Sequence, residues 1–200
     1  MIASNQTPLQ IVEEIFGMYE IFGNAEYIGE PVTQMEHMSQ AAELAIRQGL
    51  DDEVVLAAFF HDIGHICVQR NSSNDMKGLG TIAHEKVGAD FLRQRGFPER
   101  IACMVESHVQ AKRYLTRRDP KYYEGLSSAS KQTLALQGGV MSEHEARSFE
   151  QHPDFEIYVT LRRLDEQAKE AGRALINLNL LKQMTLRIIS NYLQDLKKPF

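Results

Sequence analysis

The stretch VVLAAFFHDIGH, residues 54–65, places a histidine and an aspartate directly after seven apolar residues. An imidazole and a carboxylate at the end of such a run are costly to bury unless something compensates their charge and their hydrogen-bonding demand. A metal ion does both. His61 and Asp62 are therefore the first candidates for a functional site, near the C-terminal end of a predicted helix that begins after Asp51.

Four more side chains of the same two types lie on other predicted helices. They are His37, His84, His108 and Asp165. Imidazoles and carboxylates from separate helices can converge in the core of a bundle, where coordination to a cation offsets the cost of removing them from water. A single histidine is more often a structural or surface residue. The six residues taken together favour a metal site.

At the end of a helix, His61 and Asp62 can be arranged to serve one ion or to bridge two. Asp62 has two carboxylate oxygens and is the natural bridge between them. The remaining ligands would divide into His37, His61 and Asp165 on one ion, and His84 and His108 on the other. This division is a hypothesis about geometry.

Apolar residues recur mostly at three- and four-residue intervals, which predicts an all-α protein. The predicted helices span residues 8–22, 33–48, 81–95, 99–112, 126–134, 155–171 and 179–196, with two more beginning after residues 51 and 142. Thr33 and Ser142 each have a glutamate three residues later, as in a capping box, and Thr81 is a third candidate cap. Residues 69–80 are rich in Asn, Ser, Asp and Gly and indicate a surface loop, which is a candidate lid. Without a repeat or a long linker, residues 1–200 are predicted to form a single domain.

The composition excludes several classes of protein. A net charge of −5 gives no general attraction to nucleic acid or to anionic lipid, and no local basic patch is evident. No apolar run approaches the roughly 20 residues that span a bilayer. Cys67 and Cys103 lack partners at metal-ligand spacing, and with no secretory leader they are expected to be reduced thiols of a cytoplasmic protein. His144 and His152 lie in a polar stretch and are expected at the surface; no obligate protein partner is evident.

The motif HDIGH at residues 61–65 resembles the hallmark of the HD-domain superfamily of helical metalloenzymes. The segments HEKVGA at 84–89 and SH at 107–108 strengthen this resemblance. Most members are metal-dependent phosphohydrolases. A smaller branch, similar to inositol oxygenase, holds a mixed-valent diiron centre and activates dioxygen.

Four segments are similar to one family of that oxygenase branch, the 2-amino-1-hydroxyethylphosphonate dioxygenases. They are YIGE at 27–30, QMEH at 34–37, SHVQAKRYL at 107–115 and LRRLDEQAK at 161–169. The resemblance implies an HD-type helical bundle around two irons, Fe(II) and Fe(III), with dioxygen as co-substrate. It also implies oxidative cleavage of the carbon–phosphorus bond of a small 1-hydroxyphosphonate. The products would be phosphate and either glycine or glycine betaine.

The resemblance also implies which residues meet the substrate. Tyr27 would occupy an iron until substrate displaces it, and Glu30 would face the cationic end of the substrate. A phosphonate is a compact anion that needs cationic groups and hydrogen-bond donors. The implied positions for it are His65, Lys112, Ser130 and Arg162. Lys112 lies one helical turn after His108 on the same face, independently of any resemblance. The plainer alternatives are solvated charges, a loop tyrosine, a capping serine and a core histidine.

Three alternatives stay open. An HD-type phosphohydrolase would split a phosphate ester or nucleotide without oxygen. A signalling module that has lost its metals should lack a ligand, and every expected position is filled here. Within the oxygenase interpretation, a primary amine favours acceptors such as Glu30, whereas a trimethylammonium group also favours aromatic faces. The candidates for those faces are Tyr27, Phe59, Phe60 and Tyr114, the last three of which also suit core packing.

Overall fold

Helices are the regular structure of the computed structural model, which describes residues 6–27, 29–69 and 71–198. Among these residues there are helices and two isolated β-bridges but no strand, which confirms the all-α prediction. Ile28 of the YIGE segment and Arg70 of the predicted loop lie outside the described residues. The helices are α1 (Pro8–Phe22), α2 (Gln34–Arg47), α3 (Asp52–Phe60), the 3-10 turn η1 (Ile63–His65), α4 (His84–Gln94), α5 (Glu99–Arg118), α6 (Pro120–Gly125), α7 (Ser128–Leu136), α8 (Glu143–Glu150), α9 (Phe155–Gln167) and α10 (Leu178–Asp195).

Three helices begin at a capping box. In this arrangement the N-cap side chain accepts a hydrogen bond from the backbone amide three residues later, and the side chain of that later residue accepts one from the N-cap amide. This arrangement fixes the helix start from local sequence alone. The predicted starts at Thr33 and Ser142 are confirmed. The three boxes pair Thr7 with Gln10, Thr33 with Glu36, and Ser142 with Glu145.

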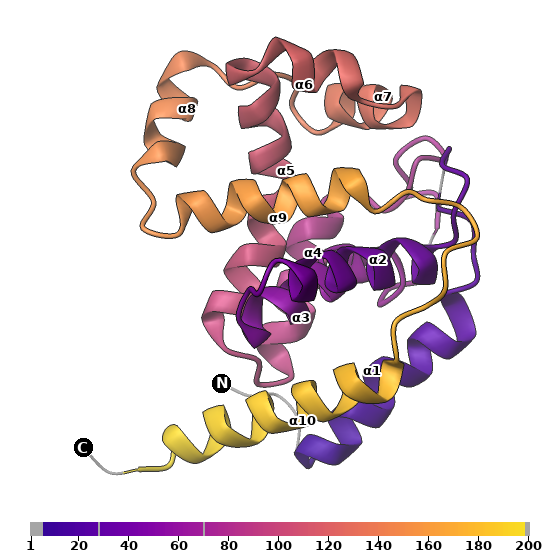
Figure 1. Cartoon of the computed structure of the whole chain (residues 1–200), viewed down its shortest axis with the longest axis vertical. Coiled ribbons are helices and arrows are strands. Elements are labelled where there is room, and N and C mark those ends of the chain that lie inside the picture. Colours follow the sequence, from indigo (N-terminus) through magenta and orange to yellow (C-terminus); the bar gives the residue numbers. More distant parts are fainter. Residues whose placement is uncertain (1–5, 28, 70, 199–200) are drawn as a thin grey trace.

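The centre of the bundle is α3. Its residues 54–60 are all buried, as expected for a helix that is apolar on every side. α2, α5, α9 and α10 pack against it, and α9 crosses the long α5 (Figure 1). In the same view α6, α7 and α8 lie at one end of the bundle, and α1 and α10 lie at the other. This packing brings α2, α3, α5 and α9 together around the end of α3 that carries His61.

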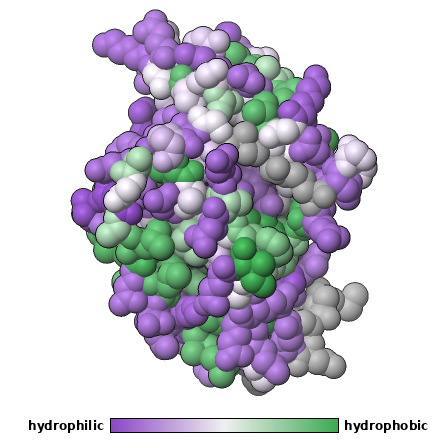
Figure 2. Space-filling view, turned by 90° about the vertical axis from the view of Figure 1, so that its right-hand side faces the viewer, coloured by the Kyte–Doolittle hydropathy of each residue, from purple (hydrophilic) through white to green (hydrophobic). Residues whose placement is uncertain are grey.

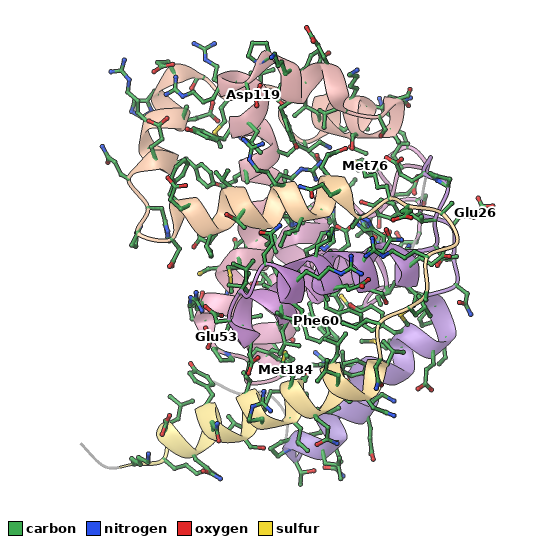
Figure 3. The ribbon with its side chains drawn as sticks, in the orientation of Figure 1. Glu26, Glu53, Phe60, Met76, Asp119 and Met184 are labelled. Atoms are coloured by element: carbon green, nitrogen blue, oxygen red, sulfur yellow. The ribbon has the colours of Figure 1, made fainter. Side chains whose placement is uncertain are left out.

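An aromatic cluster anchors α1 to α3. The Phe16 ring stacks on Phe59 with centroids 5.7 Å apart, and Tyr19 lies 4.7 Å from Phe59. The Tyr19 hydroxyl also donates to the Phe59 carbonyl at 3.4 Å. Phe60 is fully buried and is labelled in Figure 3. Aromatic pairs at these distances stabilise a core beyond the area that they bury.

The predicted start of α4 at Thr81 is wrong. α4 begins at His84, and Ala83 before it has a left-handed backbone with φ of 52°. Thr81 is instead buried, forms a β-bridge with Asp75, and donates its amide to His65 Nδ1 at 3.0 Å. Tertiary contacts therefore place Thr81 in the loop, three residues before the helix begins.

Other helix boundaries also differ from prediction. α5 continues to Arg118 rather than ending at Lys112, and only Asp119 lies between it and α6. α9 ends at Gln167 rather than at Ala171. There the Ala168 carbonyl leaves the helix and accepts a hydrogen bond from His37 Nδ1 at 2.8 Å. The end of α9 thus serves the site.

The surface is mixed in character. Figure 2 shows hydrophobic residues gathered across the middle of one face, with hydrophilic residues over most of the rest. The described helices include none that is both long and apolar enough to cross a bilayer.

Candidate dinuclear metal centre

The structure brings all six predicted metal ligands together. Each is at most 4% exposed. They come from α2, the two residues that follow α3, the start of α4, α5 and α9, so the site joins most of the bundle. The six are His37, His61, Asp62, His84, His108 and Asp165.

The first group of ligand atoms surrounds one point. His37 Nε2 lies 3.0 Å from His61 Nε2 and 3.3 Å from Asp165 Oδ1. His61 Nε2 lies 3.3 Å from Asp62 Oδ2. Metal bonds of roughly 2.1 Å place neighbouring ligands about 3 Å apart, so these spacings suit coordination. The first group can hold one ion with four protein ligands.

The second group uses the other oxygen of Asp62. Its Oδ1 lies 3.2 Å from His84 Nε2 and 3.5 Å from His108 Nε2, and these two nitrogens are 3.0 Å apart. Asp62 therefore points one oxygen at each group, as the bridging hypothesis requires. The second group offers three protein ligands against four in the first.

Hydrogen bonds to backbone carbonyls fix the orientation of three imidazoles on the side away from the site. Each Nδ1 faces a backbone carbonyl, which only accepts hydrogen bonds, so each Nδ1 must carry a proton. In the neutral ring, Nε2 then presents its lone pair to the site. The contacts are His37 to Ala168 at 2.8 Å, His61 to Ala58 at 2.8 Å, and His108 to Val105 at 2.7 Å.

Two buried carboxylate oxygens show that the site needs positive charge. Within the part of the chain that the structure describes, Asp62 Oδ2 and Asp165 Oδ1 have no hydrogen-bond partner, although both are shielded from solvent. An unpaired buried carboxylate oxygen is costly, and here each faces imidazole nitrogens instead of donors. Burial opposes a charged His61, yet Asp62 and Asp165 raise the pKa of His61 to about 9. The donor set therefore fits a pair of metal ions.

His84 is held differently from the other histidines. Its Nδ1 has no hydrogen-bond partner among the described residues, and the Glu85 carboxylate lies 3.6 Å away. The His65 ring stacks on His84 with centroids 4.0 Å apart. Packing, more than hydrogen bonding, therefore sets the position of His84.

Two glycines let α4 approach close enough to deliver His84. A Cβ added at Gly64 would lie 1.9 Å from the His84 carbonyl oxygen, and one at Gly88 would lie 3.0 Å from the Gly64 nitrogen. At Gly64 the obstructing atoms are all backbone, so they cannot move aside cheaply. The glycine of the HDIGH motif is explained by this contact.

Gly64→Ala is expected to push α4 away and to lower both stability and metal content. The methyl group overlaps backbone, so we expect a loss of about 2 kcal/mol or more in the free energy of unfolding. Metal analysis should show the second ion lost more readily than the first, since only the second group uses His84. Gly17→Ala is the matched control, because a Cβ there meets nothing within 4 Å. Two ions bound at normal stability in Gly64→Ala would contradict this account.

A pocket opens on one side of the ligand set. Asp62, His84, His108 and Asp165 form its floor, whereas His37 and His61 do not reach it. Met76 and Leu79 contribute apolar wall from the predicted loop, and Figure 3 shows Met76 near α7 and the C-terminal half of α9. The six residues predicted to meet substrate all line this pocket. They are Tyr27, Glu30, His65, Lys112, Ser130 and Arg162.

Lys112 is a buried cation in the pocket wall. It is 3% exposed, and its ammonium donates to Thr133 Oγ1 at 2.7 Å and to Gln137 Oε1 at 3.2 Å. Burial, with Arg162 adding repulsion, lowers the pKa of Lys112 to about 7. Both partners are neutral, so the charge of Lys112 is available to an anion.

Arg162 is more heavily engaged than the sequence indicates. Its guanidinium donates to the Tyr122 hydroxyl at 2.6 Å, to Asp165 Oδ2 and to Glu166 Oε2. Although burial opposes ionisation, Arg162 and His61 hold the pKa of Asp165 well below its usual range. Arg162 thus orients a predicted metal ligand while also lining the pocket. Glu166 could have been found from its four-residue spacing, but Tyr122 carries no sequence signal.

Tyr27 and Glu30 lie on the segment between α1 and α2. The Tyr27 ring stacks on His37 with centroids 4.0 Å apart. Burial, with Asp62 and Asp165 nearby, raises the pKa of Tyr27 well above its usual range. The Glu30 carboxylate accepts from Ser127 Oγ at 2.5 Å. Sequence reasoning missed Ser127, which also caps α7 through the Ser130 amide.

The predicted aromatic faces for a trimethylammonium group do not gather at this pocket. Phe59 and Phe60 belong to the core cluster, and Tyr114 donates to Glu150 at 2.9 Å on another part of the molecule. Tyr27 lines the pocket. His144 and His152 are exposed, as predicted.

The comparisons with known proteins agree with this geometry. The model of the HD domain family matches residues 35–136, which hold five of the six ligands. The chain belongs to the HD-domain family. This HD-domain protein is 42% identical over 161 residues to the glycine-betaine-forming 1-hydroxy-2-(trimethylamino)ethylphosphonate dioxygenase of Leisingera caerulea, covering 80% of this chain and 81% of the relative.

Two further relatives span most of this HD-domain protein. The hydroxymethylphosphonate dioxygenase of Gimesia maris is 37% identical over 172 residues, which cover 86% of this chain and 85% of that protein. An uncharacterized protein of Acanthamoeba polyphaga mimivirus is 40% identical over 182 residues, which cover 91% of this chain and 83% of that protein. The predicted resemblance to the phosphonate dioxygenases is confirmed.

Proposed function

We propose that this HD-domain protein is a non-haem diiron oxygenase that cleaves the carbon–phosphorus bond of a 1-hydroxyphosphonate. The substrate is (2-amino-1-hydroxyethyl)phosphonate or its N-trimethyl analogue, and the products are phosphate and glycine or glycine betaine. One observation carries the proposal. The ligand set around Asp62 forms the floor of a pocket whose wall contains two cationic side chains, Lys112 and Arg162, suited to a phosphonate. The same wall contains the Glu30 carboxylate, which suits an ammonium. Relatives named as phosphonate dioxygenases support it.

The proposed cofactor is a pair of iron ions in the mixed-valent Fe(II)/Fe(III) state. Imidazole and carboxylate ligands without thiolate suit iron, although they also suit other divalent metals. When bound, the pair supplies the redox chemistry that activates dioxygen. The donor set of four histidines and two aspartates supports this choice.

Different residues of the pocket bind different parts of the substrate. Lys112, with Ser130 and Arg162, offers donors to the phosphonate, and His65 offers a ring nitrogen beside His84. The group with three protein ligands faces the pocket and keeps more coordination positions free for substrate. This arrangement holds C1 of the substrate above the ligand set.

Glu30 and the apolar wall act on the rest of the substrate. Glu30 binds the cationic group of the substrate, whereas Met76 and Leu79 exclude water from the carbon–phosphorus bond that breaks. We further propose that residues 1–200 act as a single HD-type domain on a small molecule in the cytoplasm, where the free thiols Cys67 and Cys103 would stay reduced.

The test is oxygen uptake measured together with phosphate release. We expect both with the primary amine or the trimethylammonium substrate, in equal amounts, and neither under argon. Iron analysis should find two ions per chain, and electron paramagnetic resonance should show a coupled Fe(II)/Fe(III) pair. Phosphate release from a phosphate ester without oxygen would instead identify a phosphohydrolase.

Glu30→Ala is expected to raise the KM for a substrate with a cationic end by about tenfold, because a charge-assisted contact is lost. Iron content should stay near that of the wild type, since Glu30 is outside the ligand set. Glu13→Ala is the control, because Glu13 is an exposed acid of α1 that does not line the pocket. Loss of iron in Glu30→Ala would place Glu30 among the metal ligands.

Lys112 is expected to take up a proton when a phosphonate binds. The pKa of Lys112 is about 7 in the free pocket, so at pH 8 most of these side chains are neutral. A dianionic phosphonate favours the charged form and raises the pKa. Affinity should therefore fall as the pH rises above 7, by up to about tenfold per pH unit.

Calorimetry under argon, in two buffers of different ionisation enthalpy at pH 8, measures this proton uptake. The wild type should take up more protons than Lys112→Met, a difference that cancels the titration of the phosphonate itself. Equal uptake in the two proteins would show that Lys112 does not meet the anion.

A further inference from the structure

The Glu30 carboxylate already has a counter-ion within the protein. Lys169 Nζ lies 3.0 Å from Glu30 Oε1, and the two side chains are 14% and 8% exposed. Lys169 follows the end of α9, whereas Glu30 lies before α2, so the pair joins distant parts of the sequence. Any cation that approaches Glu30 from the pocket therefore meets a carboxylate that is already paired.

Lys169 is held in place by other groups. Its ammonium donates to Glu166 Oε1 at 2.8 Å and lies 3.4 Å from Ser130 Oγ. Burial opposes its charge, but Asp165 and Glu166 raise the pKa of Lys169 above its usual value. Lys169 is thus a fixed cation with two acid partners, and it does not depend on Glu30 alone.

Charges of alternating sign lead from the pocket to the metal ligands. Glu30 pairs with Lys169, Lys169 with Glu166, Glu166 with Arg162, and Arg162 with Asp165. In such a row each internal charge has a neighbour of opposite sign on both sides. Glu30 is the terminal member. Among the described residues its ionic partner is Lys169, and Ser127 donates a hydrogen bond to the same oxygen. The strength of Glu30 as a cation receptor is therefore set largely by Lys169.

We propose that Lys169 is a specificity-determining residue, which competes with the cationic end of the substrate for Glu30 and so limits the preference for cationic over uncharged phosphonates. The inference rests on the proposed function. An ammonium gains less from a carboxylate that keeps a counter-ion than from an unpaired one. A phosphonate without a cation loses less in such a pocket, because Glu30 is not left unpaired beside it.

The test compares two ligands that differ in charge at this end. Calorimetry under argon with iron-loaded protein gives the Kd of (2-amino-1-hydroxyethyl)phosphonate and that of hydroxymethylphosphonate, with no turnover. We define the affinity ratio as the affinity for the cationic ligand divided by the affinity for hydroxymethylphosphonate. In Lys169→Met we expect this ratio to rise about tenfold. Any loss of attraction for the phosphonate group is common to both ligands and cancels in the ratio.

Three variants serve as controls. Lys169→Arg keeps the charge and should leave the ratio near that of the wild type. Lys121→Met removes an exposed lysine of α6 and should also leave it unchanged. The double variant Glu30→Gln, Lys169→Met removes both charges, so it should fold even if Lys169→Met does not, and its ratio should lie below that of the wild type.

An unchanged or lower ratio in Lys169→Met, or a raised ratio in the double variant, would overturn the inference alone. Failure of the wild type to bind either phosphonate would overturn the proposed function, and the inference with it. A raised ratio in Lys169→Met, together with a wild-type ratio in Lys169→Arg, would support the competition between Lys169 and substrate.

Discussion

Asp62→Ala is expected to lose both metal ions and at least about a thousandfold in oxygen-dependent phosphate release. Asp62 is the residue that contributes an oxygen to each ligand group, at 3.3 Å from His61 Nε2 and 3.2 Å from His84 Nε2. Without it the first group has three ligands and the second has two. Metal analysis and oxygen uptake measure the loss.

Stability should fall as well, because imidazole nitrogens remain around a buried space without the carboxylate that pairs with them. The midpoint of thermal unfolding, taken with and without added iron, should become independent of iron. Asp90→Ala on α4 is the control, since its carboxylate is 47% exposed and pairs with Arg93 at the surface. Two ions per chain in Asp62→Ala would end the bridging interpretation.

Arg162→Met is expected to cost about 3 kcal/mol or more in the free energy of unfolding, because it leaves the buried Asp165 carboxylate without its cation. The Asp165 Oδ2 and Glu166 Oε2 contacts and the Tyr122 hydroxyl all lose their donor. Affinity for the metal in the first group should drop by about 10- to 100-fold, since Asp165 is no longer oriented. Chelator competition and denaturant unfolding measure the two effects.

Arg163→Met is the matched control, because the neighbouring side chain is 51% exposed and lies 3.9 Å from Asp119. Arg162→Lys keeps the charge but cannot make the same set of contacts, so it should lie between the two. If Arg162 served the phosphonate alone, Arg162→Met would bind metal normally and lose only affinity for substrate. That result would contradict the orienting role.

Local sequence was enough to predict most of the helices. The Thr33 and Ser142 capping boxes fix helix starts through contacts within four residues. Local sequence failed where contacts with distant residues set the course of the backbone. The Thr81 amide binds His65 and α4 begins three residues later, whereas α9 ends before Ala168, whose carbonyl binds His37.

The sequence by itself determined the fold class and the types of the candidate ligands, because helix periodicity, capping and the chemistry of histidine and aspartate are local properties. The tertiary structure decided how Asp62 divides its two oxygens, and that Arg162 holds Asp165 as well as lining the pocket. It also decided that Lys169 reaches Glu30. These outcomes depend on distances between residues far apart in the chain, which packing alone sets.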